Sequence, residues 1–133
     1  MTIVTSSRKP TPEVRKLAKE IAFALDFPYI QRGKTGLREF GDEDPKMIFL
    51  SGSKRKGQLF DRTVNGEIVF SMLITNTIVS ERTGVFYKGF VTREEELFAR
   101  LSRYVPTVFD EEADGPICFC GTQKMQYVLQ VMV

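Results

Sequence analysis

Hydroxyl and basic side chains gather directly ahead of the first expected helix, in the segment TSSRKPT that begins at Thr5. Ser6, Ser7 and the free N–H groups at the start of a helix can donate hydrogen bonds to an anion, and the helix dipole adds partial positive charge there. Arg8 would fork onto phosphate oxygens, whereas Lys9 would act as a point charge. The segment therefore predicts a phosphate-binding loop, with an ordinary strand–helix loop as the alternative.

The segment QRGKTGLR repeats this chemistry just beyond the helix, with Arg32, Lys34 and Arg38 around two glycines. In a β-α-β unit, the loop after the second strand can lie at the same sheet edge as the loop after the first. Two loops with hydroxyls, glycines and bases would then form one concave phosphate site. The spacing of a nucleotide P-loop is absent. In the alternative interpretation the glycines serve only the turns.

Three further bases, Lys54, Arg55 and Lys56, occupy the expected tip of a hairpin in the segment GSKRKG. Adjacent bases on an exposed tip can reach into a nucleic-acid groove or follow its phosphate backbone. Loop tips are also commonly charged for solubility, which is the alternative here.

The outward face of the first expected helix carries Arg15, Lys16 and Lys19 against the single acid Glu20. Arg15 and Lys19 are like charges at positions i and i+4, which costs a few tenths of a kcal/mol in an isolated helix. A face that tolerates this repulsion favours an anionic partner, with a merely solvated face as the alternative. Phe23 extends the same face, where it would either stack on a base or cover a strand.

The residue types that the sequence lacks exclude several kinds of catalytic and metal site. The chain has no histidine, which excludes hydrolysis by a Ser/His or Cys/His pair. A structural zinc site would need ligands from another chain. Cys118 and Cys120 lie at i and i+2 of an expected strand, so both point to one face, a poor geometry for bridging each other. We interpret them as buried thiols, and no catalytic residue, metal site or cofactor is predicted.

Two acidic clusters offer oxygen ligands of the kind that Mg²⁺ prefers. One covers Asp42–Asp44 and the other covers Asp110–Asp114. Both lie in expected loops and lack the ligand pattern of a calcium loop, so we interpret them as solvated turns. A Mg²⁺-dependent phosphate-ester enzyme is the least favoured alternative, because no base or nucleophile accompanies these acids.

The 133 residues are 42% hydrophobic and 27% charged, within the ordinary range of globular proteins. No apolar run approaches the roughly 20 residues that span a bilayer, and charged residues precede any apolar stretch, unlike in a signal peptide. We therefore expect a soluble, intracellular protein with no membrane partner. Residues 1–62 hold 13 Lys and Arg against 8 Asp and Glu, a net charge of +5, and residues 63–133 hold 6 against 9, a net charge of −3. The chain thus divides into a basic half and an acidic half.

Hydrophobic periodicity and turn residues predict an α/β layered domain with a mixed sheet. Thr11 is the expected N-cap of the first helix, Pro12 its first residue and Asp26 its end. The buried stripe of this helix is expected to be Val14, Leu17, Ala18, Ile21, Ala22 and Leu25. The expected strands cover residues 2–4, 27–30, 47–51, 58–64, 67–79, 117–120 and 126–133.

Two local patterns organise the remainder of the chain. The dipeptide Asn65-Gly66 predicts a two-residue hairpin. The buried face of the strand that follows is expected to be Ile68, Phe70, Met72 and Ile74. The pattern Thr92-x-x-Glu95 predicts a capping box that opens a helix over residues 92–104. The core stripe of this helix is expected to be Leu97, Phe98 and Leu101, and a further short helix is expected over residues 36–40.

Together these features resemble the Brix domain family of ribosome-biogenesis proteins, over the stretch Thr5–Phe40. The family opens with Thr-Ser-Arg-Lys/Pro, then a helix with basic residues and a Lys-Glu pair, a strand, and a basic-glycine-basic stretch before a Leu-Arg-Glu/Asp helix. In this chain those features fall on Thr5–Pro10, Arg15–Glu20, Tyr29–Lys34 and Leu37–Glu39. The resemblance covers about a quarter of the chain, and the C-terminal half carries no second clear signature.

The resemblance implies one domain over residues 1–133, built of two related halves and similar to the anticodon-binding domain of some tRNA synthetases. It implies a non-enzymatic factor that binds precursor ribosomal RNA, or an associated small RNA, during rRNA processing and subunit assembly. The chain is similar to the compact archaeal members, which implies a cytoplasmic location, or a nucleolar one if the source is eukaryotic. Other ribosome-assembly proteins would then bind the acidic half. A tRNA-binding accessory module is the alternative that the same fold permits.

The predicted RNA contacts all come from the basic half of the chain. They are Ser6, Ser7, Arg8, Lys9, Arg15, Lys16, Lys19, Arg32, Lys34, Arg38, Lys54, Arg55 and Lys56. Because phosphate contacts dominate the affinity of such surfaces, we expect RNA binding that weakens steeply as salt is added.

Overall fold

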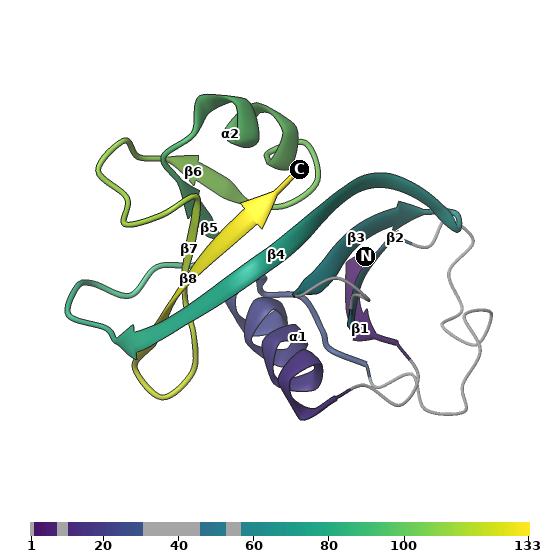
Figure 1. The fold of residues 1–133 in the computed structure, drawn as a ribbon, viewed down its shortest axis with the longest axis horizontal. Helices are drawn as coiled ribbons and strands as arrows, with labels where there is room; N and C mark the ends of the chain where they lie inside the picture. The colour runs from purple at the N-terminus through teal and green to yellow at the C-terminus, as the bar shows by residue number, and fades with distance from the viewer. Residues whose placement is uncertain (1, 8–10, 31–45, 53–56) are drawn as a thin grey trace.

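A mixed sheet of eight strands and two helices make up the part of the chain that the computed structural model describes, residues 2–7, 11–30, 46–52 and 57–133 (Figure 1). The strands are β1 (Thr2–Ser6), β2 (Lys46–Gly52), β3 (Gln58–Val64), β4 (Glu67–Glu81), β5 (Phe90–Thr92), β6 (Thr107–Phe109), β7 (Ile117–Cys120) and β8 (Met125–Met132). The helices are α1 (Pro12–Leu25) and α2 (Glu95–Leu101). The sheet order is β1-β2-β3-β4-β8-β7-β5-β6. The predicted α/β class with a mixed sheet is confirmed.

The strand pairing shows two halves of related topology. In the first half, β1 leads into α1 and the chain returns at Tyr29, which forms a parallel bridge with Val4. In the second half, β5 leads into α2 and the chain returns as β6, parallel to β5. Each half ends in an antiparallel pair, β3–β4 or β7–β8, and the first half has β2 in addition. The antiparallel strands β4 and β8 join the halves at the middle of the sheet.

Helix α1 forms as its local sequence predicts. Thr11 is the N-cap, and its Oγ1 accepts a hydrogen bond from Val14 N at 3.3 Å. Asp26 ends the helix in the left-handed region at φ 59°, where its N–H reaches the last turn. The predicted stripe is buried in full. Because α1 packs against β1, β2 and β7, it lies between strands of both halves.

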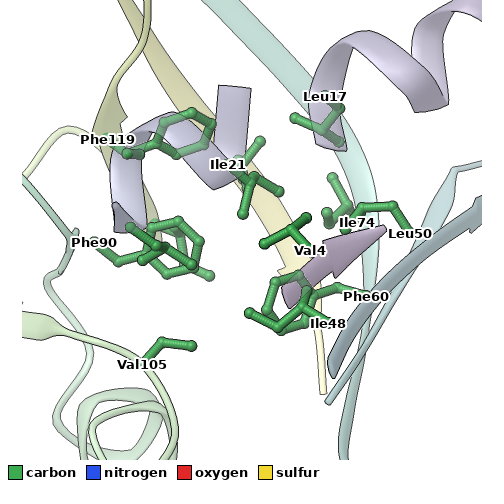
Figure 2. Packing of buried hydrophobic residues seen from close by; sticks show 14 of the residues in the cluster. Val4, Leu17, Ile21, Ile48, Leu50, Phe60, Ile74, Phe90, Val105 and Phe119 are labelled. Carbon is green, nitrogen blue, oxygen red and sulfur yellow. The ribbon is translucent and has the colours of Figure 1, made fainter. Parts of the chain in front are cut away.

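The core is continuous across the two halves. Figure 2 shows side chains from α1, from the first-half strands and from β5 and β7 converging on one cluster. The ring of Phe90 bridges the halves, with its centroid 6.3 Å from that of Phe60 and 5.6 Å from that of Phe119. Since all three rings are fully buried, the two halves cannot separate without exposing this cluster.

The predicted hairpin at Asn65-Gly66 is confirmed, with φ 54° and 83° at the two turn residues. On β4, three of the four predicted core positions are buried, but Ile68 is 61% exposed. The register between β3 and β4 shifts at this point, so that Val69 is an extra residue between the pairs made by its neighbours. Such a bulge interrupts the alternation of side chains, which explains why Ile68 faces solvent.

The prediction for the second helix was wrong in its bounds and in its cap. The helix covers Glu95–Leu101, and Glu94 is an N-cap without a side-chain hydrogen bond. Thr92 belongs to β5, where it pairs with Phe109 of β6 and is fully buried. A backbone held in a parallel ladder cannot begin a helix at the same residue, so the capping box does not form. The Thr92 hydroxyl instead accepts a hydrogen bond from Glu94 N at 3.1 Å.

The structure also tests the predicted core stripe of the second helix and the predicted state of the two cysteines. The side chains of Leu97 and Leu101 are buried as predicted, while Phe98 is half-buried with its ring edge-on to Phe109 at 6.2 Å. Cys118 and Cys120 are buried and free, as expected. Burial raises the pKa of the Cys118 thiol, which keeps it protonated and unreactive. Within the described ranges, neither helix has the length and apolar content needed to cross a membrane.

Candidate nucleic-acid interface

Three neighbouring segments of the first half run parallel and end at the same edge of the sheet. Tyr29 pairs with β1 on one side, and β2 pairs with β1 on the other. Ser7, Ile30 and Gly52 are the residues where these segments end. Ser7 N donates to Leu50 O at 3.0 Å, and Thr5 Oγ1 donates to Ile30 O at 2.6 Å, so the three ends are hydrogen-bonded together.

Each of these three ends directly precedes one of the basic segments singled out from the sequence. The sequence predicted that the loop after β1 and the loop after the short strand at Tyr29 share one edge of the sheet, and the described ends at Ser7 and Ile30 lie at that edge. It made no such prediction for β2, whose described end at Gly52 lies at the same edge. Nothing in the local pattern of residues 46–52 indicates that β2 pairs with β1 in parallel, because strand partners are set by the tertiary fold.

Most of the predicted contacts lie outside the described residues. They are Arg8, Lys9, Arg32, Lys34, Arg38, Lys54, Arg55 and Lys56. The expected helix over residues 36–40 and the acidic cluster Asp42–Asp44 lie outside them as well. The described part of the predicted site is therefore Ser6, Ser7 and the basic face of α1.

The two predicted serines differ in accessibility. Ser6 is only 1% exposed, and its Oγ lies 3.3 Å from the hydroxyl of Tyr29. Its hydroxyl is thus part of the packing at the β1 edge and does not face solvent, contrary to the sequence prediction. Ser7 is half-buried and follows the strand. Lys19 reaches back over the Tyr29 ring, with Nζ 5.7 Å from its centroid, so α1 and this edge form one surface.

The basic face of α1 lines a shallow groove of about 250 Å³. Lys16 and Lys19 are exposed, while Arg15 is half-buried. The Arg15 Nε is buried and has no hydrogen-bond partner in the described structure. A buried, unpaired guanidinium N–H costs free energy, and a phosphate oxygen is one partner that would satisfy it. The groove is thus suited to an anion.

Glu20 also lines this groove, but its carboxylate is hydrogen-bonded to the second half of the chain. It is 8% exposed, and its carboxylate accepts hydrogen bonds from Thr122 N at 2.7 Å and from Thr122 Oγ1 at 2.6 Å. The contact needs Gly121, because a Cβ there would meet Glu20 Oε2 at 2.7 Å and a ring carbon of Tyr127 at 2.5 Å. Glu20 therefore holds α1 against the second half. Glu13 is then the exposed acid on α1 that offsets the positive charge of the outward face.

A second, larger groove of about 480 Å³ lies between α1 and the middle of β4. Lys16 lines both grooves, so the two are contiguous at this residue. Gly57 and Gln58 line the end of the groove nearest the β2–β3 hairpin. Its β4 wall combines the polar residues Thr75, Asn76 and Thr77 with Ile74 and Val79, and Glu13 lines the helix side. Amides and hydroxyls of this kind bind base edges and 2′-hydroxyls, whereas lysines bind phosphates.

The ring of Phe23 packs in a way that neither interpretation of the sequence predicted. Its ring lies edge-on to Phe86 with centroids 5.9 Å apart, and Lys88 Nζ lies 3.9 Å from its centroid. Both partners come from the β4–β5 loop. The ring of Phe23 is therefore covered by a loop of the second half and not by a strand.

The acidic residues show no arrangement typical of a metal centre. In the described ranges, no three or more Asp, Glu, Cys or His side chains are grouped as metal ligands. Asp110 Oδ1 accepts a hydrogen bond from Glu112 N at 2.9 Å, which is a turn that uses the carboxylate locally.

Comparison with known proteins adds a family resemblance to this geometry. No family model matches the chain. A protein of Methanosarcina barkeri described as a probable Brix domain-containing ribosomal biogenesis protein is 29% identical over 90 residues, which cover 65% of this chain and 57% of that relative. The chain thus matches little more than half the length of this relative. Mil, an archaeal Imp4-like protein, has a similar fold, with a TM-score of 0.63 over 98% of this chain and 99% of the solved one at 14% identity. The resemblance to the Brix family is confirmed.

Proposed function

From this resemblance and the basic edge of the sheet, we propose that the protein is an RNA-binding factor of ribosome biogenesis. It binds precursor ribosomal RNA, or a small RNA associated with it, during rRNA processing and subunit assembly, and it has no catalytic activity. The observation that carries the proposal is the convergence of three strand ends, each followed by a basic segment, beside the groove of Arg15, Lys16 and Lys19.

The chemistry of this surface favours RNA over a small anion. The two grooves along α1 share Lys16 and combine cations with amides and hydroxyls, and Glu13 and Glu20 are the acids beside them. Cations neutralise phosphates and supply most of the affinity, and the polar wall supplies contacts to sugars and bases. A surface of this length suits several successive nucleotides of a single strand.

The acidic second half has a separate role in the proposal. Glu94–Glu96 and Asp110–Glu112 are exposed for the most part, and they repel RNA. This half is therefore the surface for other ribosome-assembly proteins. The protein acts in the cytoplasm, or in the nucleolus if its source is eukaryotic.

The test is a titration of fluorescently labelled single-stranded RNA at several salt concentrations. If about six phosphate contacts form, the logarithm of the affinity falls with the logarithm of the salt concentration with a slope of roughly −4. The double variant Lys16→Gln/Lys19→Gln should reduce that slope by about 1.4, since each single-strand phosphate contact contributes about 0.7. Incubation of the same RNA with Mg²⁺ and the protein should leave it intact.

The matched control is Arg93→Gln/Arg103→Gln, which removes the same charge from exposed positions of the second half. It should leave the salt slope nearly unchanged. The proposal would be contradicted if the two double variants lost the same RNA affinity, or if the salt slope of wild type were flatter than about −1. In either case the basic face would be only a solvated surface.

A further inference from the structure

The basic stripe of α1 ends on an aromatic side chain. Lys16, Lys19 and Phe23 follow one another at helical spacings of three and four residues, so they lie in one line along the helix. The line runs from the first turns of α1 toward its C-terminal end, a distance of about 10 Å from Lys16 to Phe23 at a rise of about 1.5 Å per residue. An RNA strand that follows the cations therefore reaches Phe23.

At that end the β4–β5 loop is fastened onto the helix. Lys88 Nζ donates a hydrogen bond to Phe23 O at 2.8 Å, and Gly89 N donates to Ala24 O at 2.6 Å. The start of the loop is held as well, because Arg82 N donates to Lys124 O at 2.7 Å in the β7–β8 turn. These bonds fix the loop before any ligand arrives.

The fastened loop nevertheless presents apolar and cationic side chains to solvent. Phe86 is 40% exposed and Val85 is 88% exposed. The guanidinium carbon of Arg82 lies 5.0 Å from the Phe86 ring centroid, and Lys88 Nζ lies 5.4 Å from it. In the described structure, neither cation forms an ion pair with a carboxylate. The loop thus holds a partly exposed ring with two cations over it, neither of them paired with a carboxylate in the described ranges.

We propose that Phe23, Arg82, Phe86 and Lys88 form a second contact for the same single-stranded RNA. A nucleobase stacks on the exposed part of Phe86, and the adjoining phosphates lie against Arg82 and Lys88. This aromatic–cation cluster belongs to the second half except for Phe23, so the acidic half contributes to RNA binding at this one place. The inference rests on the proposed function, because the cluster continues the line of cations on α1.

The combination of side chains points to a single strand and not to a duplex. Base faces are available for stacking on an aromatic ring only where they are unpaired. Two cations beside one ring match the alternation of base and phosphate along such a strand. A duplex would engage the cations but leave the ring unused.

The first experiment compares Phe86→Ala with Phe86→Leu on a single-stranded RNA of about eight nucleotides, a length within the site sizes of small single-strand binding domains. Both variants should bind about tenfold more weakly, since leucine keeps the apolar cover over Phe23 but cannot stack. The salt slope should stay unchanged, because stacking releases no counterions. The affinity for a duplex RNA of equal length should not change. Thermal melts of both variants confirm that they fold.

The second experiment removes the charge. Lys88→Gln should reduce the salt slope by about 0.7, and the control Arg103→Gln, at an exposed cation just after α2, should not. Equal slopes for Lys88→Gln and wild type would overturn the phosphate contact.

The third experiment uses the fact that the chain has no tryptophan. Phe86→Trp introduces a single fluorescent ring that keeps the capacity to stack, so the variant should bind RNA like wild type and its emission should be quenched by bound single strands. If wild type binds no RNA, the proposed function fails. A different outcome would overturn only the role of the aromatic–cation cluster. In that outcome wild type binds RNA and Lys16→Gln/Lys19→Gln weakens the binding, but the Phe86 variants bind normally and show no quenching.

Discussion

In the first half of the sheet, the parallel segments at Tyr29, β1 and β2 end where the basic segments begin; in the second half, the parallel strands β5 and β6 end where acids begin. Thr92 leads into Glu94–Glu96, and Phe109 leads into Asp110–Glu112. The two halves thus share a strand–helix–strand plan but carry opposite charges at corresponding edges. The backbone plan alone therefore does not determine a binding surface, which depends on the side chains placed at the strand ends.

The two helices that follow β1 and β5 differ in the same way. Helix α1 has 14 residues and a side-chain N-cap, and it packs between strands of both halves. Helix α2 has 7 residues and no side-chain cap, and it packs on β5 and β6 of its own half. The difference indicates that α1 carries both a central part of the core and the proposed binding face, while α2 is peripheral.

The largest expected effect compares the buried side chains of the two helices. Ile21→Ala should lower the free energy of unfolding by about 2–5 kcal/mol, toward the upper end, because Ile21 is fully buried in the core shared by both halves. Leu97→Ala should cost about 2 kcal/mol, since the short α2 can settle into the space. Denaturant unfolding of both variants checks the order, and a larger loss for Leu97→Ala would contradict the peripheral role of α2.

A smaller effect compares two of the side-chain contacts that cross between the halves. Glu20→Ala should cost about 1.5–3 kcal/mol, because it removes a charged acceptor from two partly buried donors of Thr122. Arg100 lies over the ring of Phe70 of β4 at 5.3 Å and is exposed, so Arg100→Ala should cost only about 0.5–1 kcal/mol. Glu20→Gln should recover part of the loss, as measured by denaturant unfolding. Equal losses for Glu20→Ala and Glu13→Ala, an exposed acid of the same helix, would contradict this account.

The smallest effect compares the two helix starts. Thr11→Ala should cost about 0.5–1 kcal/mol, since it removes the hydrogen bond to Val14 N. Glu94→Ala should cost about 0.3–0.5 kcal/mol, because only the attraction of a carboxylate to the helix dipole is lost. Thermal melts at two salt concentrations distinguish the loss of a hydrogen bond from the loss of a charge–dipole attraction. The Glu94 effect should fade with salt and the Thr11 effect should not, and the reverse would show that the caps are misassigned.

The sequence alone determined the elements that depend on neighbouring residues. Thr11 and Pro12 start α1, and Asn65-Gly66 turns the β3–β4 hairpin, because caps and turns are satisfied by atoms a few residues apart. The buried stripe of α1 followed from helical periodicity in the same way. The parallel edge shared by β1 and the short strand at Tyr29 was also predictable, since a β-α-β unit places its strand ends together.

The tertiary structure decided the roles that depend on distant residues. Glu20 is an anchor and not a surface acid because Thr122, 102 residues away, donates to it. Thr92 joins a strand and not a helix cap because β6 pairs with it. Phe23 became the end of the aromatic–cation cluster only because the β4–β5 loop folds onto α1. Local spacing carries no information about such contacts, since the free energy that fixes them comes from burial and hydrogen bonds between segments far apart in the chain.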